Sequence, residues 1–313
     1  MKPLRAVSLF SGAGGLDLGA RQTGVETVLA VECARDPAAT YHAAFPSVVL
    51  HVGDVREQDF TVIGPVDIVH GSPPCQPFSG AAGHRGRGRK DPRDMVPAFV
   101  EAIRTMRPQA FVIENVPGLA QRRNASYWSS VLQRLASLGY SVNYAVLDAV
   151  GFGVAQYRKR LFCVGFADES VARMFVWPRP RDERVTIGDV LIGGYDLLPV
   201  SPVVARRVAA WAAGTEYSPI AAKHEVMSWN DPAHTVTSNW RRGGYYGLVY
   251  GPYGLRRFGP YAAARLQGFP DSWPWHGSRT SIYRQVGNAV PPPLGRAVMS
   301  AVVAALRSTS WVR

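Results

Sequence analysis

Cysteine, lysine and long apolar runs are all scarce in this chain of 313 residues. The three cysteines, Cys33, Cys75 and Cys163, form no CxxC pair, and no HExxH motif occurs, which argues against a disulfide framework and a zinc site. No apolar run reaches the length of about 18 residues that suggests a membrane-spanning helix, and the amino terminus lacks a signal-peptide core. The sequence therefore predicts a cytoplasmic protein with no membrane segment and no metal.

Acidic residues are fewer than basic ones. The 23 Asp and Glu stand against 35 Lys and Arg, so the formal net charge is +12, and 31 of the basic residues are arginine. The planar guanidinium matches phosphates and guanine edges, so this surplus indicates a polyanionic partner. With 47% hydrophobic and 19% charged residues, the composition is that of a globular protein rather than a disordered one.

Strand-like apolar runs alternate with amphipathic stretches in the first half of the chain. The runs span 5–10, 27–32, 48–52, 66–70, 110–114, 140–147 and 160–166, and the helical stretches include 95–106 and 126–138. This alternation predicts an α/β fold with a doubly wound, mostly parallel sheet. In such a sheet, ligands bind beyond the carboxyl ends of the strands.

The residue pattern changes after residue 169. Frequent prolines, paired arginines and short irregular apolar runs predict a second, smaller domain at 170–255. A regular pattern returns at 262–267 and in a helix expected at 291–306. We therefore expect a first domain at 1–169 that is completed by 256–313 returning at the carboxyl terminus.

A glycine-rich turn follows the first predicted strand. Gly12 and Gly14 let the backbone approach a ligand closely, but Asp17 replaces the third glycine of a dinucleotide fingerprint and would disfavour a pyrophosphate. Glu32 ends the second strand, where a carboxylate can bond both ribose hydroxyls, and Asp54 follows the next strand. The pattern fits a nucleoside without phosphates, or else a tight turn followed by an acid that caps a helix.

Reactive side chains follow three further strands. Cys75 lies in a loop stiffened by prolines, Glu114 ends the fifth strand, and Arg158 and Arg160 follow the sixth. Together they suit nucleophilic attack on a pyrimidine ring, because the thiol can add, the acid can bond a ring nitrogen and the arginines can stabilise charge on the exocyclic oxygen. Taken singly, they could instead be a buried thiol, a buried acid and a solvated strand. A zinc base deaminase is disfavoured, because Phe78 stands where its second cysteine would be.

These residues, in this order, resemble the DNA cytosine-5 methyltransferases of the bacterial restriction-modification type. The match spans nearly the whole chain and includes Pro73-Pro74-Cys75-Gln76, Glu114-Asn115-Val116, Gln156-x-Arg158-x-Arg160, the segment 265–270 and the segment 285–291. The resemblance implies a Rossmann-like methyltransferase fold. Its catalytic and S-adenosylmethionine-binding domain would be 1–169 with 256–313, and its target-recognition domain would be 170–255.

The resemblance also implies a mechanism on a cytosine flipped out of duplex DNA. Cys75 would add to C6, Glu114 would bond N3, and Arg158 and Arg160 would hold the pyrimidine oxygen and the cysteine loop. The methyl group of S-adenosylmethionine would pass to C5. Loss of the C5 proton and elimination of Cys75 would then release the product.

Further residues are assigned to the cofactor and to DNA. The cofactor residues that the resemblance implies are Phe10, Gly12, Gly14, Gly15, Leu16, Glu32, Cys33, Asp54, Val55 and Asn288. The expected DNA contacts are Gln76 and Ser79 beside the cysteine, Arg85, Arg87 and Arg89 in a basic loop, Thr235 in a Thr-plus-aliphatic element, and Arg241 and Arg242. The chain departs from the family at Ser8, where many members have Asp, and at Cys33, where an aromatic often stacks on adenine.

The expected partners are double-stranded DNA and a cognate restriction endonuclease, and the expected state is a monomer. Two alternatives stay open. One branch of the family methylates tRNA with the same catalytic loop, although a separate arginine-rich domain favours duplex DNA. The other is a DNA-binding relative that has lost catalysis, against which the intact Cys75, Glu114, Arg158 and Arg160 argue.

Overall fold

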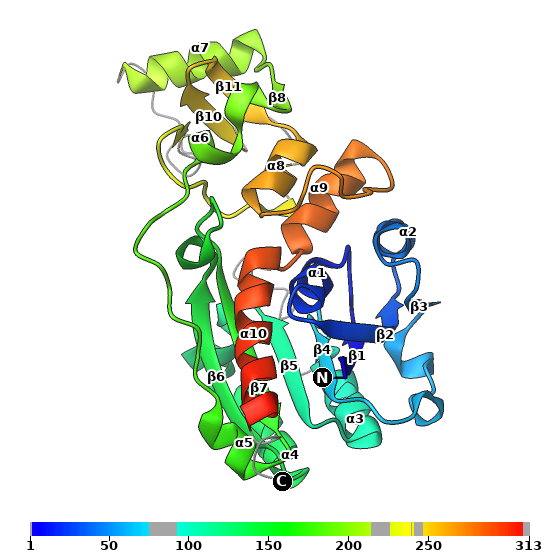
Figure 1. Ribbon diagram of the computed structural model, residues 1–313. Coiled ribbons are helices and arrows are strands. Elements are labelled where there is room, and N and C mark those ends of the chain that lie inside the picture. Colours follow the sequence, from blue (N-terminus) through cyan, green and yellow to red (C-terminus); the bar gives the residue numbers. More distant parts are fainter. Residues whose placement is uncertain (1, 75–92, 214–225, 239, 241–246, 309–313) are drawn as a thin grey trace. The chain divides into compact units, whose positions relative to one another are not determined.

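The computed structural model describes residues 2–74, 93–213, 226–238, 240 and 247–308, which form two compact units (Figure 1). Unit 1 comprises Met1–Asp148, Lys159–Arg179 and Leu294–Arg313, and unit 2 comprises Ala149–Arg158 and Pro180–Pro293. Residues 170–179 thus belong to unit 1, and 256–293 belong to unit 2. The division of function between 1–169 and 170–255 remains a prediction.

Unit 1 is built on a seven-stranded sheet in the order β3-β2-β1-β4-β5-β7-β6. Its strands are β1 (Leu4–Leu9), β2 (Val25–Glu32), β3 (Val49–Val52), β4 (Ile68–Gly71), β5 (Ala110–Asn115), β6 (Ser141–Asp148) and β7 (Lys159–Phe166). All pairs among β1 to β5 are parallel, whereas β7 runs antiparallel to both β5 and β6. The predicted α/β fold with a mostly parallel sheet is confirmed.

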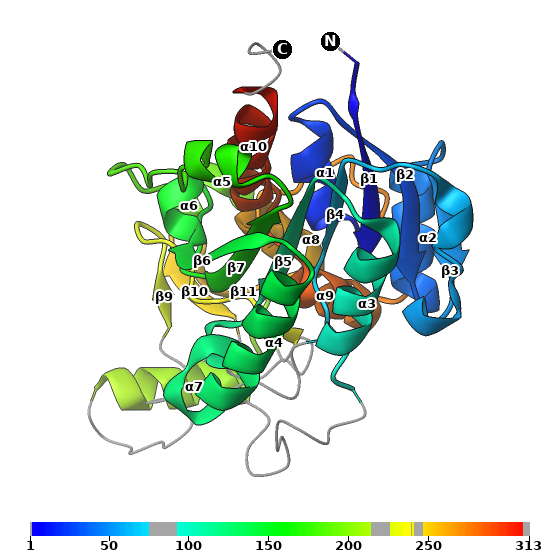
Figure 2. The ribbon, with the colours of Figure 1, turned by 90° about the horizontal axis from the view of Figure 1, so that it is seen from below.

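Helices cover both faces of this sheet, with α1 and α10 on one face and α3 and α4 on the other (Figures 1 and 2). The helices of unit 1 are α1 (Gly15–Arg21), α2 (Arg35–Ala44), α3 (Val96–Met106), α4 (Ala125–Ser137), α5 (Glu169–Met174) and α10 (Pro292–Ser308), of which α10 begins at the end of unit 2. Short 3-10 turns are η1 (Val55–Glu57), η2 (Thr61–Ile63), η5 (Pro117–Ala120) and η6 (Arg122–Asn124).

The apolar spacing of α3 shows how the sequence fixes this packing. Val96, Phe99, Val100 and Ile103 recur at helical spacing and are all buried against the sheet's core. Burying a side chain such as Phe99 contributes about 2–3 kcal/mol, so the apolar stripe fixes which face of the helix packs inward.

Unit 2 contains a four-stranded sheet in the order β8-β11-β10-β9. The strands are β8 (Leu197–Leu198), β9 (Met227–Ser228), β10 (Leu248–Gly251) and β11 (Gly254–Phe258). The helices and 3-10 turns are α6 (Ile187–Val190), α7 (Pro202–Ala212), α8 (Pro260–Leu266), α9 (Arg279–Asn288), η7 (Ala149–Phe152) and η8 (Ile192–Gly194). Trp240 stacks on Phe258 with ring centroids 5.4 Å apart, which forms part of this unit's core.

The strand order of unit 1 reverses between β1 and β4. Strands β2 and β3 lie on one side of β1, whereas β5 lies on the far side of β4. The loops after β1 and β4 therefore begin at a topological switch point. A Cβ added to Gly71, the last residue of β4, would lie 1.9 Å from the carbonyl oxygen of Leu9. Glycine therefore lets the two strand ends approach closely.

Among the described residues, one helical stretch, Arg279–Ser308, is long and apolar enough to cross a membrane by length and composition alone. Because 61% of its apolar window is buried, as in the core helix of a soluble protein, it is weak evidence for a membrane span.

Candidate active site

The turn after β1 is shaped by left-handed backbone conformations. Phe10, Gly12 and Gly14 have φ angles of 55°, 56° and 82°. Gly14 precedes α1, and a Cβ there would lie 2.5 Å from the Phe45 ring, whereas no atom of the described residues lies within 4 Å of a Cβ built on Gly12. The turn therefore packs against the protein at Gly14 and is open at Gly12, where a ligand can approach the backbone.

Glu32 connects this turn to the start of α2. One carboxylate oxygen accepts the Gly12 N–H at 2.8 Å, and the other accepts the Ala34 N–H at 2.8 Å. Glu32 is only partly buried, and each carboxylate oxygen has a second lone pair. The oxygen that accepts the Ala34 N–H also accepts the Cys33 thiol at 3.8 Å, so the carboxylate is held in place and its other oxygen retains acceptor capacity for a hydroxyl.

The remaining cofactor residues expected in unit 1 differ in their surroundings. Hydrogen bonds from Arg56 to Asp54 lower the pKa of that carboxyl to about 2. Cys33 is exposed as a residue, but its thiol is partly desolvated. This desolvation, and to a smaller extent the negative charge of Glu32, raises the pKa of the thiol. The side chains of Leu16 and Val55 are buried at 5% and 4% exposure.

Asp17 does not point toward the ligand side of the turn. It is 1% exposed, and its carboxylate accepts hydrogen bonds from Ser8 Oγ and Tyr41 Oη, each at 2.9 Å. Burial and the Asp17 charge raise the pKa of Tyr41, while burial lowers the pKa of His70, whose Nε2 lies 3.8 Å from Asp17. The Asp17 carboxylate therefore belongs to the core of unit 1.

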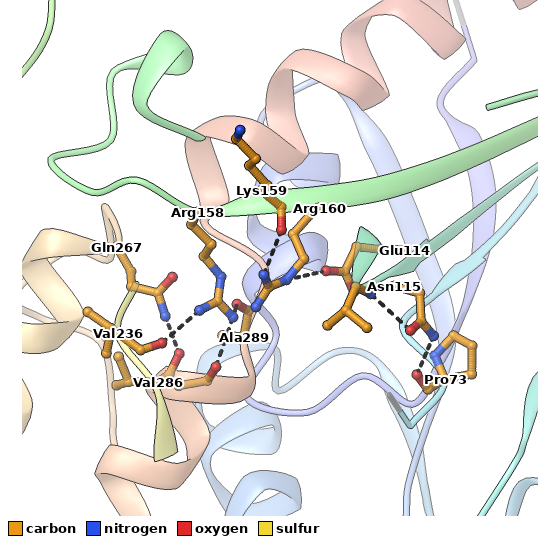
Figure 3. A network of polar contacts seen from close by, with 12 residues as sticks. Pro73, Glu114, Asn115, Arg158, Lys159, Arg160, Val236, Gln267, Val286 and Ala289 are labelled. Atoms are coloured by element: carbon orange, nitrogen blue, oxygen red, sulfur yellow. Dashed lines mark hydrogen bonds and ion pairs between the residues drawn. The ribbon is translucent and has the colours of Figure 1, made fainter. Parts of the chain in front are cut away.

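A carboxyl and a guanidinium, both expected at this edge of the sheet, form an ion pair at the end of β5. Arg160 Nε lies 2.9 Å from Glu114 Oε1, and the two side chains are 13% and 6% exposed (Figure 3). The antiparallel direction of β7 explains the contact, since its first residues pair with the last residues of β5, as in Leu161 opposite Asn115. The buried ion pair fixes the orientation of the Glu114 carboxylate.

Asn115 is a site residue that the sequence reasoning left without a role. It is 2% exposed, and its side-chain amide donates to the Pro73 carbonyl at 3.0 Å (Figure 3). Its Oδ1 accepts the Val116 N–H at 2.9 Å. Asn115 therefore holds the loop after β4 two residues before Cys75, and the signal was an amide directly after the candidate acid.

Arg158 lies in unit 2 and has different partners from Arg160. Its side chain is 1% exposed and donates to the carbonyls of Val236, Gly287 and Ala289, each at 2.8 Å (Figure 3). The sequence argument placed alternate arginines on one side of an extended strand, but β7 begins only at Lys159. Arg158 therefore precedes the strand and binds the backbone of its own unit.

Comparison with models of protein families identifies the family of this chain. The model for C-5 cytosine-specific DNA methylases matches residues 4–193 and 203–304. The chain belongs to this family. The methyltransferase therefore acts on cytosine in DNA, and members of its family use S-adenosylmethionine as methyl donor.

Individual relatives agree with that assignment. The methyltransferase is 31% identical to the type II methyltransferase M.NgoMIV of Neisseria gonorrhoeae, over 96% of this chain and 98% of that protein. It is 33% identical to the type II methyltransferase M.NaeI of Lentzea aerocolonigenes, over 98% of this chain and 76% of that protein. The predicted resemblance to restriction-modification enzymes is confirmed.

A solved structure shares the fold of the methyltransferase. The Entamoeba histolytica methyltransferase EhMeth superposes with a TM-score of 0.77, covering 98% of this chain and 99% of that one at 15% identity. At that identity the likeness concerns the fold, and it agrees with the predicted Rossmann-like class.

The other expected site residues are placed as follows. Thr235 is partly buried and donates from Oγ1 to the Tyr157 carbonyl at 2.7 Å, and Asn288 is exposed at the end of α9. Gly15 is buried in the first turn of α1. Within the described part of the chain, no cluster of His, Cys, Asp and Glu could hold a metal ion. Eight candidates lie outside the described residues, namely Cys75, Gln76, Ser79, Arg85, Arg87, Arg89, Arg241 and Arg242.

Proposed function

We propose that this DNA cytosine-5 methyltransferase extrudes a cytosine from a specific duplex sequence and methylates it through a covalent bond between Cys75 Sγ and C6. The observation that carries the proposal is the buried ion pair of Glu114 and Arg160, 2.9 Å apart. A carboxyl oriented by a guanidinium and shielded from water is a preorganised hydrogen-bonding partner for a pyrimidine ring.

The side chains divide the chemistry among them. The Cys75 thiolate adds to C6 while Glu114 hydrogen-bonds N3, and Arg160 stabilises the negative charge that develops on the exocyclic oxygen. S-Adenosylmethionine supplies the methyl group for C5. After a base removes the C5 proton, the electron pair restores the C5–C6 double bond and Cys75 leaves as a thiolate.

The turn after β1 fits the adenosine part of the cofactor. The Glu32 carboxylate retains acceptor capacity after its two backbone bonds, and the space around Gly12 is open. We assign ribose binding to Glu32. The expected contacts of Asp54 and Asn288 with the cofactor belong to the same proposal.

DNA contacts are proposed in two regions. The basic run that contains Arg85, Arg87 and Arg89 would neutralise phosphates beside the extruded base. Residues 170–255 would read the target, because major-groove contacts supply both energy and discrimination, and Arg241 and Arg242 are the candidate readers. The proposed setting is a monomer inside the cell, paired with a cognate restriction endonuclease.

Transfer of tritium from labelled S-adenosylmethionine tests the substrate. Unmethylated duplex DNA, amplified from a bacterial genome, is expected to be labelled, and tRNA is not. Bisulfite sequencing of the product then gives the target. Label in tRNA alone would replace the DNA assignment with the RNA alternative.

The covalent step has its own test. A duplex with 5-fluorocytosine at the mapped target should trap the parent protein as an adduct, whereas Cys75→Ala should form no adduct and transfer no methyl group. A fully active Cys75→Ala variant would exclude the mechanism.

A further inference from the structure

Two segments of unit 2 that lie far apart in the sequence are hydrogen-bonded along their length. The Ala233 N–H donates to the Ala155 carbonyl and the Tyr157 N–H donates to the Ala233 carbonyl, both at 2.8 Å. The Val236 N–H donates to Gln156 Oε1 at 2.7 Å. With the side-chain bond from Thr235 to Tyr157 described above, residues 155–157 bond Ala233, Thr235 and Val236 of the second segment.

Arg158 extends this network to a third segment, the carboxyl end of α9. The same guanidinium that binds the Val236 carbonyl also donates to Gly287 and Ala289, the residues on either side of Asn288. A cation at this position satisfies helix-terminal carbonyls and opposes the negative end of the helix dipole. One buried side chain therefore fixes the backbone around Asn288 and the backbone beside Thr235.

A direct backbone contact leaves little freedom between these two segments. A Cβ added to Gly287 would lie 2.4 Å from the Ser238 nitrogen and 2.6 Å from the Thr237 carbonyl carbon. The end of α9 thus packs against the 237–238 backbone with no side chain between them. Arg158 bonds both segments next to this contact.

We propose that Arg158 is a positioning residue, which holds a DNA-contacting segment and a cofactor-contacting segment in fixed register, and that it does not contact the cytosine. This inference rests on the proposed function, since that proposal gives Thr235 to DNA and Asn288 to the cofactor. The planar fork of arginine is needed because its donors reach carbonyls of two separate segments at once. A lysine has one ammonium and cannot span both sets with the same geometry.

The test compares three variants by steady-state methyl transfer to amplified genomic DNA, with active sites counted from the amplitude of the first turnover. Arg158→Lys should raise KM for DNA and KM for S-adenosylmethionine about tenfold each, with kcat per active site within about threefold of the parent. Gln156→Met removes only the acceptor of the Val236 N–H. It should therefore raise KM for DNA and leave KM for the cofactor unchanged.

Tyr283→Phe is the matched control. The Tyr283 hydroxyl donates to the Phe258 carbonyl at 2.5 Å, so this variant also loses a buried side-chain-to-backbone bond of unit 2. It touches neither of the two segments through that bond, and both KM values should stay at the parent value.

Three outcomes would overturn the inference. A fall in kcat with both KM values unchanged in Arg158→Lys would make Arg158 a base-contacting residue. A lower count of active sites with unchanged constants would make it a purely structural one. If Arg158→Lys does not fold, an unchanged KM for DNA in Gln156→Met refutes the positioning role. Absence of methyl transfer by the parent protein would instead refute the proposed function.

Discussion

The hydrogen bond from Asn115 to Pro73 is expected to control the position of the nucleophile. Asn115→Ala removes the side-chain amide that donates to the buried Pro73 carbonyl at 3.0 Å. Leaving a buried carbonyl unsatisfied costs about 1–3 kcal/mol of stability. Pro73 stands two residues before Cys75, and a misplacement of about 1 Å in a reacting group costs roughly 100-fold in rate.

We therefore expect kcat of Asn115→Ala to fall by about 10- to 100-fold, with KM for DNA close to the parent value, because the lost contact lies at the nucleophile loop. Single-turnover methyl transfer at saturating DNA and cofactor measures this rate directly. Urea unfolding of the same protein measures the accompanying loss of stability.

Asn124→Ala provides the comparison. Asn124 Nδ2 donates to the Gly118 carbonyl at 2.7 Å, which is the same kind of bond in the same unit but does not involve the segment that leads to Cys75. This variant should lose stability and keep its kcat. A parent-like kcat in Asn115→Ala, or an equal loss of kcat in both variants, would refute the reasoning.

Three further outcomes follow from the described residues. Gly71→Ala should lower stability by about 3 kcal/mol or more or yield insoluble protein, as seen in thermal unfolding, because its Cβ would lie 1.9 Å from the Leu9 carbonyl oxygen; a parent-like melting temperature would contradict it. Since hydrogen bonds from Arg56 lower the pKa of Asp54 to about 2, this exposed pair contributes a little stability above about pH 4 that is lost as the pH falls toward 2, and Arg56→Ala should move the carboxyl titration in NMR up toward pH 4. Burial raises the pKa of the Cys163 thiol, so a thiol reagent at pH 8 should label it only after unfolding, as read by mass spectrometry; rapid labelling of the folded protein would contradict its burial.

The strands and the placement of Glu114 at a sheet edge could be predicted because their signals are local. Each apolar run is bounded by polar or glycine residues, and Glu114 stands directly at a strand end, so sheet topology alone brings it to the edge where ligands bind. Arg160 was expected at the same edge, but its ion pair with Glu114 was not predicted, because that contact depends on the antiparallel direction of β7, which the periodicity of the strand does not reveal.

The roles of Asp17 and Arg158 could not be read in the same way. Asp17 is held by Tyr41, which lies 24 residues further along the chain, and Arg158 bonds Gly287 across 129 residues. Such partners are set by tertiary packing, which local spacing does not reveal. Helix α9 was not predicted either, because its buried face includes Gln285 and Gly287, which carry no apolar side chain to complete the pattern of Ile282, Tyr283 and Val286.

The interrupted chain path of unit 1 has a consequence for its synthesis. Unit 1 is completed by Leu294–Arg313, which is made only after Pro180–Pro293. Gly295 of α10 packs against Leu16 of α1, so the sheet face that carries α1 lacks this cover until the last segment arrives. At about 5–20 residues per second, a ribosome needs roughly 6–23 s to make the intervening stretch. Throughout that interval the apolar side chains of α1 that α10 covers in the finished protein lack that cover, so the catalytic unit is completed only by the segment made after unit 2.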